Sequence, residues 1–264
     1  MTRPLTAALL VCCGTTAMAQ DAVRDIRLVP GWSEPDGTYI AALSIALEPG
    51  WKTYWRSPGE GGIPPLFDWS GSDNLERVDV IWPTPEVYYT YGMRSVGYEN
   101  QVVFPLVMTP TGDGPIAATL DLSIGVCLDV CIPADASLSV VLPRDEVHNV
   151  DAITRIMAHG PAEAADMGLT EAMCDFTLLP DGALSLTARL AFADIPVDDP
   201  VTVFEIAHMA GDIWIGPSET TRDDTGFTAT ARVDYFGEGA FSAQRDQIRI
   251  SLLTPGRVYE QNGC

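Results

Sequence analysis

The residues best suited to chemistry in this chain are two cysteines separated by three residues, Cys127 and Cys131. The chain has six cysteines, and the two nearest its start lie in an expected signal peptide, which leaves four. An even number of cysteines in an oxidising compartment indicates disulfide bonds. Because thiols and disulfides exchange with one another, such a pair can carry electrons as well as stabilise a fold.

The sequence around Cys127 and Cys131 favours a bond between these two residues. Apolar β-rich residues flank both cysteines, and a hairpin with three intervening residues would place them opposite each other, with Cα atoms ~4.5 to 5.5 Å apart. Cys174 and Cys264 are then left as partners. The short bridge should add only about 2 kcal/mol of stability and the long one about 4.6 kcal/mol. We therefore expect the long bridge to be a structural staple.

The residues alone leave three interpretations of the Cys127/Cys131 pair open: a redox-active disulfide, a structural hairpin bridge, or two ligands of a metal site. The metal site has the least support, because the histidines are scattered along the chain, at His148, His159 and His208. No metal is therefore expected.

The charged residues near the pair in sequence do not favour a reactive thiolate. Asp129 lies between the cysteines, and a negative charge opposes thiolate formation. Lys52 or Arg56 could approach the sulfurs in three dimensions, although a surface position is the simpler interpretation for both.

The elements that must position these residues are short β-rich runs. Apolar and polar residues alternate, as in residues 119–124, which is typical of an antiparallel strand with one buried face. The spacing of the runs predicts a β-sandwich; they cover residues 38–47, 78–82, 102–109, 117–126 and 137–142. From residue 174 strands resume, with a hairpin around Pro180-Asp181-Gly182.

This pattern predicts an all-β chain of two domains. We expect a signal peptide over residues 1–19, a first β-sandwich domain over 20–147, a linker with a short helix over 148–170, and a second, smaller β-sandwich-like domain over 171–264. The helix competes with an irregular loop as the interpretation of the linker.

The ends and the charge of the chain indicate an exported protein. Arg3, an apolar run and the small residues up to Ala19 have the layout of a cleavable signal. No later stretch reaches the ~18 apolar residues of a membrane-spanning helix, so no membrane insertion is expected after cleavage. The mature chain carries 14 basic and 36 acidic side chains, a net charge of −22, with Lys52 as the only lysine. Nucleic acid is therefore not an expected partner.

Two blocks of sequence resemble a known family. Residues 50–65, which contain Trp-Arg-Ser-Pro-Gly, together with Phe67-Asp68-Trp69 and the block Cys-x3-Cys-Ile-Pro-Ala from Cys127 to Ala134, are similar to the N-terminal periplasmic domain of DsbD-type and ScsB-type disulfide reductases. The resemblance covers roughly residues 25–143.

This resemblance implies an immunoglobulin-like domain in the periplasm that passes electrons from a membrane-embedded disulfide reductase to thioredoxin-fold proteins. Cys131 matches the cysteine that forms the mixed disulfide with partners, and Cys127 matches the resolving cysteine. A loop that caps the disulfide is matched by residues 88–93, with the candidate cap residues Tyr88, Tyr89, Tyr91 and Gly92. Alternatively, these tyrosines are aromatic residues of a strand edge.

The expected function is therefore thiol–disulfide exchange of the protein-disulfide reductase type. No cofactor is expected, because two sulfurs suffice for the chemistry. This chain departs from the family in lacking a membrane domain and a thioredoxin-like domain, so we expect a separate electron donor, and its cysteine spacing is shorter. The alternative is a non-catalytic periplasmic binding or chaperone module with structural disulfides, with a role in copper tolerance as one form of it.

Overall fold

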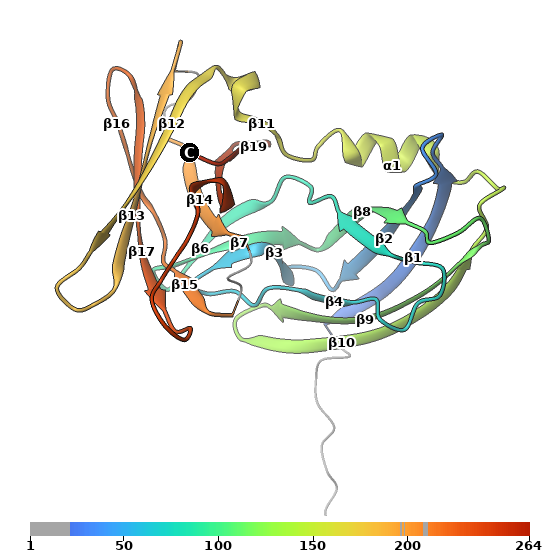
Figure 1. Cartoon of the computed structure of the whole chain (residues 1–264). Coiled ribbons are helices and arrows are strands. Elements are labelled where there is room, and N and C mark those ends of the chain that lie inside the picture. The colour runs from blue at the N-terminus through green and yellow to red at the C-terminus, as the bar shows by residue number, and fades with distance from the viewer. Residues whose placement is uncertain (1–21, 196, 198, 208–210) are drawn as a thin grey trace, which may run out of the picture.

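Two pairs of stacked β-sheets make up the structure, a computed structural model that describes residues 22–264 except 196, 198 and 208–210. One pair is formed by the N-terminal half and the other by the C-terminal half, and the two pairs lie side by side (Figure 1). The expected signal peptide, residues 1–19, and His208 lie outside the described residues.

The first unit consists of two antiparallel sheets. One sheet has the strand order β1-β2-β8-β5, with β1 (Val23–Ser33), β2 (Tyr39–Leu47), β5 (Arg77–Val80) and β8 (Gln101–Thr109). The other has the order β10-β9-β3-β7-β6, and β4 also pairs with β9; these strands are β3 (Lys52–Gly59), β4 (Leu66–Asp68), β6 (Glu86–Thr90), β7 (Met93–Glu99), β9 (Ile116–Cys127) and β10 (Cys131–Leu142).

Alternation of side chains along the strands builds the core of this unit. In β9 every second residue from Ile116 to Val126 is buried, while Asp121 and Ser123 between them are exposed. In β2, by contrast, both faces are buried. One face belongs to the core between the sheets, and Ile40 and Ala42 on the other pack with Ile153 of helix α1 (Val150–Met157). The helix expected in the linker thus covers the outer face of the first sheet.

The second unit consists of two smaller sheets. One has the order β11-β19-β18-β14 and the other β12-β13-β17-β15, with β16 also paired to β17. Their strands are β11 (Ala162–Glu163), β12 (Leu169–Leu178), β13 (Leu184–Phe192), β14 (Val201–Ile206), β15 (Ile213–Ile215), β16 (Glu219–Arg222), β17 (Gly226–Tyr235), β18 (Ile248–Thr254) and β19 (Arg257–Asn262), with 3-10 turns η2 (Ala164–Met167) and η3 (Arg245–Gln247). The hairpin expected around residue 181 joins β12 and β13, so that prediction is confirmed.

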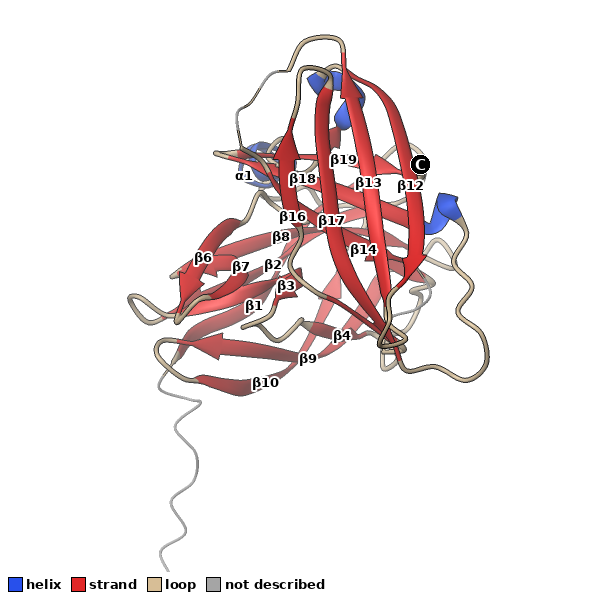
Figure 2. Cartoon of the chain, turned by 90° about the vertical axis from the view of Figure 1, so that its left-hand side faces the viewer, coloured by secondary structure: helices blue, strands red, loops and turns tan. Residues whose placement is uncertain are grey.

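Strand β14 faces the first unit, and the second pair of sheets stands across the end of the first (Figure 2). Val203, Leu253 and Val258 of the second unit belong to the same buried cluster as the core of the first. The all-β fold of sandwich units predicted from the sequence is confirmed. Among the described residues, no helix has the length and apolarity needed to cross a membrane.

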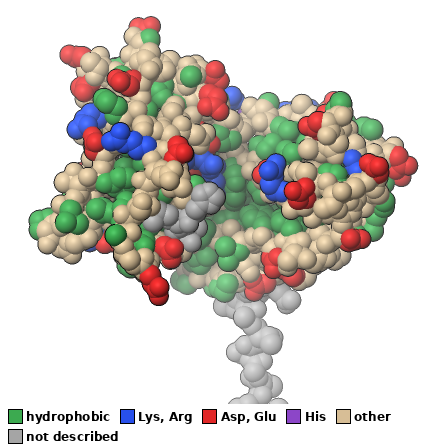
Figure 3. Space-filling model, in the orientation of Figure 1, with side chains coloured by type: hydrophobic (Ala, Val, Ile, Leu, Met, Phe, Trp, Pro, Cys, Tyr) green, Lys and Arg blue, Asp and Glu red, His purple; other side chains and the backbone are tan. Residues whose placement is uncertain are grey.

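The surface reflects the acidic composition. On the face shown in Figure 3, acidic side chains are scattered over both lobes, and hydrophobic side chains gather between them. A surface of this charge disfavours contact with other anionic surfaces.

Candidate functional site: the Cys127–Cys131 disulfide

The hairpin of β9 and β10 holds the two cysteines opposite each other. Cys127 is the last residue of β9, Cys131 is the first of β10, and the two are paired in the antiparallel register. Their sulfurs are bonded, with the Cα atoms 4.2 Å apart. The three residues that join them, 128–130, are all exposed, so the disulfide lies at the tip of a projecting hairpin.

The two sulfurs differ in exposure. Cys127 is buried, with 6% of its surface accessible, whereas Cys131 is exposed. The difference follows from position, because Cys127 ends a central strand that pairs with β3 as well as β10, while β10 is the edge strand of the sheet. A molecule approaching from solvent therefore meets Cys131 first.

Tyr54 of β3 supplies the closest polar group to the disulfide. Its hydroxyl oxygen lies 2.6 Å from Cys127 Sγ, 3.0 Å from Cys131 Sγ and 3.1 Å from the carbonyl oxygen of Gly61, to which it can donate. Burial raises the pKa of Tyr54, so the hydroxyl stays protonated and remains a donor. The sequence interpretation did not single out this residue, although it lies two positions from Lys52 in the block that carries the family resemblance.

A close-packed loop holds the Tyr54 ring in place. A Cβ atom on Gly62 would lie 2.7 Å from the Tyr54 ring and 2.4 Å from Pro58 Cβ, so only glycine fits at this position. The loop therefore brings the Gly61 carbonyl to the Tyr54 hydroxyl and also close to Cys131, whose Sγ lies 3.7 Å from that oxygen.

The expected cap segment forms the β6–β7 hairpin. Tyr91 and Gly92 are the two turn residues, with φ angles of 51° and 83°, which corresponds to a tight turn of the type that matches strand twist. Tyr91 and Met93 line a small cavity of about 80 Å³ together with both cysteines.

The remaining tyrosines of the segment lie on edge strand β6 and do not line this cavity. Tyr89 is exposed, and the Tyr88 hydroxyl donates to Glu86. Of the candidate cap residues, the structure thus brings only Tyr91 to the disulfide, with Gly92 completing its turn. The strand-edge interpretation describes Tyr88 and Tyr89.

Lys52 also lines the cavity around the disulfide. It pairs with Cys127 in the register of β3 and β9. Its ammonium lies 5.1 Å from the centre of the Tyr88 ring and 3.9 Å from a carboxylate oxygen of Glu99. The only lysine of the chain therefore stands at the candidate site, and so does Asp129, which lines the same cavity.

Arg56 lies elsewhere, and its expected surface position is wrong. Between Tyr54 and Gly59 the register of β3 with β7 shifts, and this bulge directs the Arg56 side chain away from the sheet. Its guanidinium binds Glu205 of β14 at 2.9 Å and also Glu260 of β19, and only 12% of the side chain is accessible. Arg56 thus joins the two units.

The second disulfide connects Cys174 of β12 with Cys264 at the end of the chain, with Cα atoms 5.5 Å apart. It ties one sheet of the second unit to the segment that follows the other sheet. Cys174 is buried, with 2% of its surface accessible. This bridge belongs to the interior of the unit.

The structure does not gather metal ligands among its described residues. No group of three His, Cys, Asp or Glu side chains in that part of the chain is placed to hold an ion. His148 bonds Glu146, and His159 bonds the carbonyl oxygen of Arg155, both far along the chain from the cysteines.

Comparison with known proteins places these features in a family. Residues 25–143 match the family described as "Thiol:disulfide interchange protein DsbD, N-terminal". The resemblance seen in the sequence is therefore confirmed for this segment.

The fold extends this likeness beyond the matched segment. The crystal structure of the N-terminal periplasmic domain of ScsB from Proteus mirabilis superposes with a TM-score of 0.69 and 24% sequence identity, over 93% of this chain and 94% of that one. Both β units thus have counterparts in the fold of that domain. A search of curated proteins finds no match.

Proposed function

We propose that this chain is a periplasmic thiol–disulfide exchange protein whose Cys127–Cys131 pair cycles between disulfide and dithiol. Its electrons come from a membrane-embedded reductase and pass to thioredoxin-fold partners. The observation that carries the proposal is the pairing of one exposed and one buried sulfur beside a hydroxyl donor, in a segment that matches a thiol:disulfide interchange family. We assign the redox role to a domain of residues 20–147.

The difference in exposure supports a separate role for each sulfur. A donor thiolate attacks Cys131 Sγ and forms a mixed disulfide, and Cys127 leaves as a thiolate. A second donor thiolate then attacks the donor sulfur of the mixed disulfide and releases Cys131, so two electrons have entered the pair and the donor is left as a disulfide. When the reduced pair passes its electrons on, the Cys131 thiolate attacks a partner disulfide and forms a mixed disulfide. Cys127 then attacks Cys131 Sγ, which re-forms the disulfide and releases the reduced partner.

Tyr54 and Lys52 favour the thiolate that each step produces. The Tyr54 hydroxyl, at 2.6 Å from Cys127 Sγ, can turn from the Gly61 carbonyl to donate to a thiolate, which is a stronger acceptor than a disulfide sulfur. The ammonium of Lys52 offsets the negative charge of Asp129 in the same cavity. Burial alone would disfavour a charged sulfur at Cys127.

Tyr91 acts as the cap that limits access to the pair. A tyrosine in the left-handed region costs about 1 kcal/mol or more, and such strain is concentrated at functional positions. The Tyr91 side chain lines the cavity of the disulfide, and 85% of the residue's surface is accessible. A partner can therefore displace the ring without disrupting packing in the hydrophobic core. Tyr91 thus narrows the approach of small thiols to the pair, while Cys131 stays accessible to a docked partner.

The surroundings of the disulfide fit a protein partner. Exposed apolar side chains follow the rim of the site at Tyr91, Met93, Leu128 and Val130, the last with 72% of its surface accessible. Apolar side chains exposed together are typical of a protein interaction site. The thioredoxin-fold protein would cover this rim while its cysteine reaches Cys131.

The test is a redox titration in glutathione buffers, read by thiol alkylation and mass spectrometry. The Cys127–Cys131 pair should be reduced reversibly above about −300 mV while the fold stays intact, and the Cys174–Cys264 pair should stay oxidised as an internal control. Cys127→Ser should trap a thioredoxin-fold protein through Cys131, whereas Cys131→Ser should trap far less, because Cys127 is buried.

The competing function is a binding or chaperone module in which both disulfides are structural. The same apolar rim supports it, because a docking surface needs no electron transfer. Resistance of the Cys127–Cys131 bond to reduction until the protein unfolds would exclude exchange and leave the binding module as the function.

A further inference from the structure

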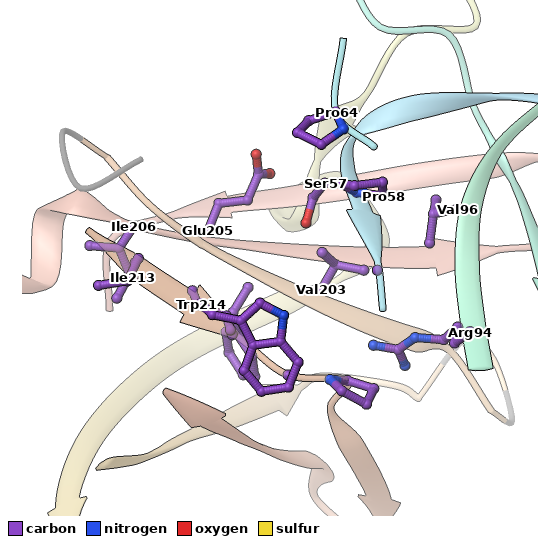
Figure 4. Close-up of a pocket in the computed structure, with 15 residues that line it drawn as sticks. Ser57, Pro58, Pro64, Arg94, Val96, Val203, Glu205, Ile206, Ile213 and Trp214 are labelled. Atoms are coloured by element: carbon purple, nitrogen blue, oxygen red, sulfur yellow. The ribbon is translucent and has the colours of Figure 1, made fainter. Parts of the chain in front are cut away.

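A second cavity lies between the two β units, apart from the disulfide. It has a volume of about 310 Å³, within the range of small-molecule pockets, and such pockets favour interfaces between domains. Strands β3 and β7 contribute one wall, and β14 and β15 contribute the other (Figure 4). The walls are mostly apolar, formed by side chains such as Val96, Val203, Ile213, Trp214 and Ile215.

Arg94 brings a positive charge into this apolar space. Only 9% of the residue is exposed, and Figure 4 shows its guanidinium directed toward Val203 and Trp214. Nη1 donates to the carbonyl oxygen of Ser218 at 3.3 Å, while Nε has no hydrogen-bond partner. Among the described residues no carboxylate forms an ion pair with it. Burial lowers the pKa of Arg94 more than the nearby Tyr89 and Glu60 raise it, and the Glu60 carboxylate accepts from the backbone N–H of Arg94 and not from its guanidinium.

Burying the Arg94 guanidinium lowers the stability of the fold unless an anion binds to it. A buried charge needs a partner, and a guanidinium binds a carboxylate through two parallel hydrogen bonds. Arg56, a partly buried arginine at this interface, has two carboxylates. One of them, Glu205, also lines the cavity, but Arg56 already holds it at 2.9 Å. Among the described residues, the Arg94 guanidinium thus has Glu60 only as a more distant negative charge and lacks the directly bonded carboxylates of Arg56.

We propose that the cavity between the units binds a small carboxylic acid with an apolar body. The carboxylate pairs with the Arg94 guanidinium, and the apolar body lies against Trp214 and Val203. Trp214 is 42% exposed, so a ligand would cover apolar surface that is now open to water.

Strand β7 separates this site from the disulfide, because the two cavities lie on its opposite faces. Successive residues of β7 point to opposite faces of the sheet. Met93 and Ser95 line the disulfide cavity, while Arg94 and Val96 line the cavity between the units. Variants of Arg94 therefore leave both cysteines and their neighbours Tyr54 and Lys52 in place. The test of this proposal is consequently independent of the test of thiol exchange.

The test is isothermal titration of the full chain with octanoate and with octanol, which share an alkyl body of similar size. Octanoate should bind the wild-type protein more tightly than octanol. Arg94→Met should weaken octanoate about tenfold or more and leave octanol unchanged, since only the charged hydrogen bonds are lost. Arg77→Met, an exposed arginine on β5, is the matched control and should change neither affinity.

A second variant separates loss of the site from loss of the fold. Trp214→Ala, at a partly exposed wall position, should weaken octanoate and octanol alike, while the circular dichroism of the protein stays unchanged. Equal affinity of the wild-type protein for octanoate and octanol, or no heat from either, would overturn the proposal. An unchanged octanoate affinity in folded Arg94→Met would overturn it as well.

Discussion

The two sulfurs of the candidate site have different surroundings, and this difference decides which chemistry each can do. Cys131 meets solvent, whereas Cys127 is buried against β3 and within 2.6 Å of the Tyr54 hydroxyl. A directional exchange needs an exposed sulfur for the incoming thiolate to attack. It also needs a leaving sulfur whose thiolate can accept a hydrogen bond, as a buried Cys127 beside Tyr54 could. At the residue scale, we therefore expect the neighbours of Cys127 to set the rate and the potential of the proposed exchange.

Tyr54→Phe tests the hydroxyl. A hydrogen bond to a charged group contributes about 1.5–3 kcal/mol, and 1.36 kcal/mol corresponds to one pKa unit, so loss of the donor should raise the pKa of the Cys127 thiol in the reduced protein by about one unit. The thiolate absorbance at 240 nm against pH measures this shift. Tyr98→Phe, which removes a buried hydroxyl bonded to the Pro83 carbonyl, is the control and should leave the thiol unchanged. An unaltered titration in Tyr54→Phe would exclude the donor role.

Lys52→Met tests the cation that, among the described residues, lines the cavity of the disulfide. Removing a nearby positive charge disfavours the thiolate, so the pKa of the thiol should rise, by less than about one unit because water screens a partly exposed charge. The rate of iodoacetamide alkylation against pH gives the value. Lys52→Arg keeps the charge and should behave as the wild type, and a shift of equal size in both variants would argue for packing instead of charge.

At the scale of elements, two hairpins from different parts of the chain meet at the site. The β9–β10 hairpin presents the disulfide, and the β6–β7 hairpin presents Tyr91 beside it. Strand β3 lies between β9 and β7 in the sheet and supplies Tyr54 and Lys52 to the site. The proposed cap is thus the turn of a two-stranded hairpin, and Tyr91 is its first turn residue.

Tyr91→Ala tests the cap at this scale. Without the ring, small thiols approach the pair through a wider opening, so reduction by glutathione should become severalfold faster while the equilibrium potential stays the same. Alkylation of the free thiols after short exposures to glutathione quenches the reaction and gives the rate of disulfide reduction. Tyr89→Ala is the matched control, because Tyr89 is exposed on β6 but does not line the cavity. Equal acceleration in both variants would contradict a cap formed by Tyr91.

At the scale of the whole molecule, the second unit is docked on the first by partly buried ion pairs and by shared apolar packing. Arg56, from the bulge of β3, reaches Glu205 and Glu260 of two different strands in the second unit. The guanidinium also lies over the Trp55 ring, 4.1 Å from its centre. These contacts consequently hold the first unit, with the candidate site, in one orientation relative to the second unit.

Arg56→Ala should lower the free energy of unfolding by about 3 kcal/mol, because two carboxylates are left close together without their cation. Urea denaturation measures this loss, and small-angle scattering should detect a wider separation of the units. The triple variant Arg56→Met, Glu205→Gln, Glu260→Gln removes all three charges and should recover most of the stability. A single variant as stable as the wild type would mean that apolar packing alone docks the units.

The sequence by itself determined the local features, because short-range rules govern them. Alternation along residues 119–124 predicts a half-buried strand, and three residues between cysteines in β-rich surroundings predict a hairpin disulfide, which is the arrangement found. The family blocks point to thiol exchange, and they place Tyr91 and Gly92 in a cap segment without predicting the two-residue turn that the structure shows. The boundaries of the two domains at residues 147 and 171 stay a prediction.

Only the tertiary structure decided which side chains surround the disulfide and which join the units. Tyr54 and Arg56 are two residues apart, yet a register shift after Tyr54 sends one to the sulfurs and the other to Glu205 and Glu260, some 150 and 200 residues along the chain. A bulge changes the face on which each following side chain lies, and its place depends on how β3 pairs with β7. That pairing, like the cavity beside Arg94, is set by packing between distant segments, for which no local pattern exists.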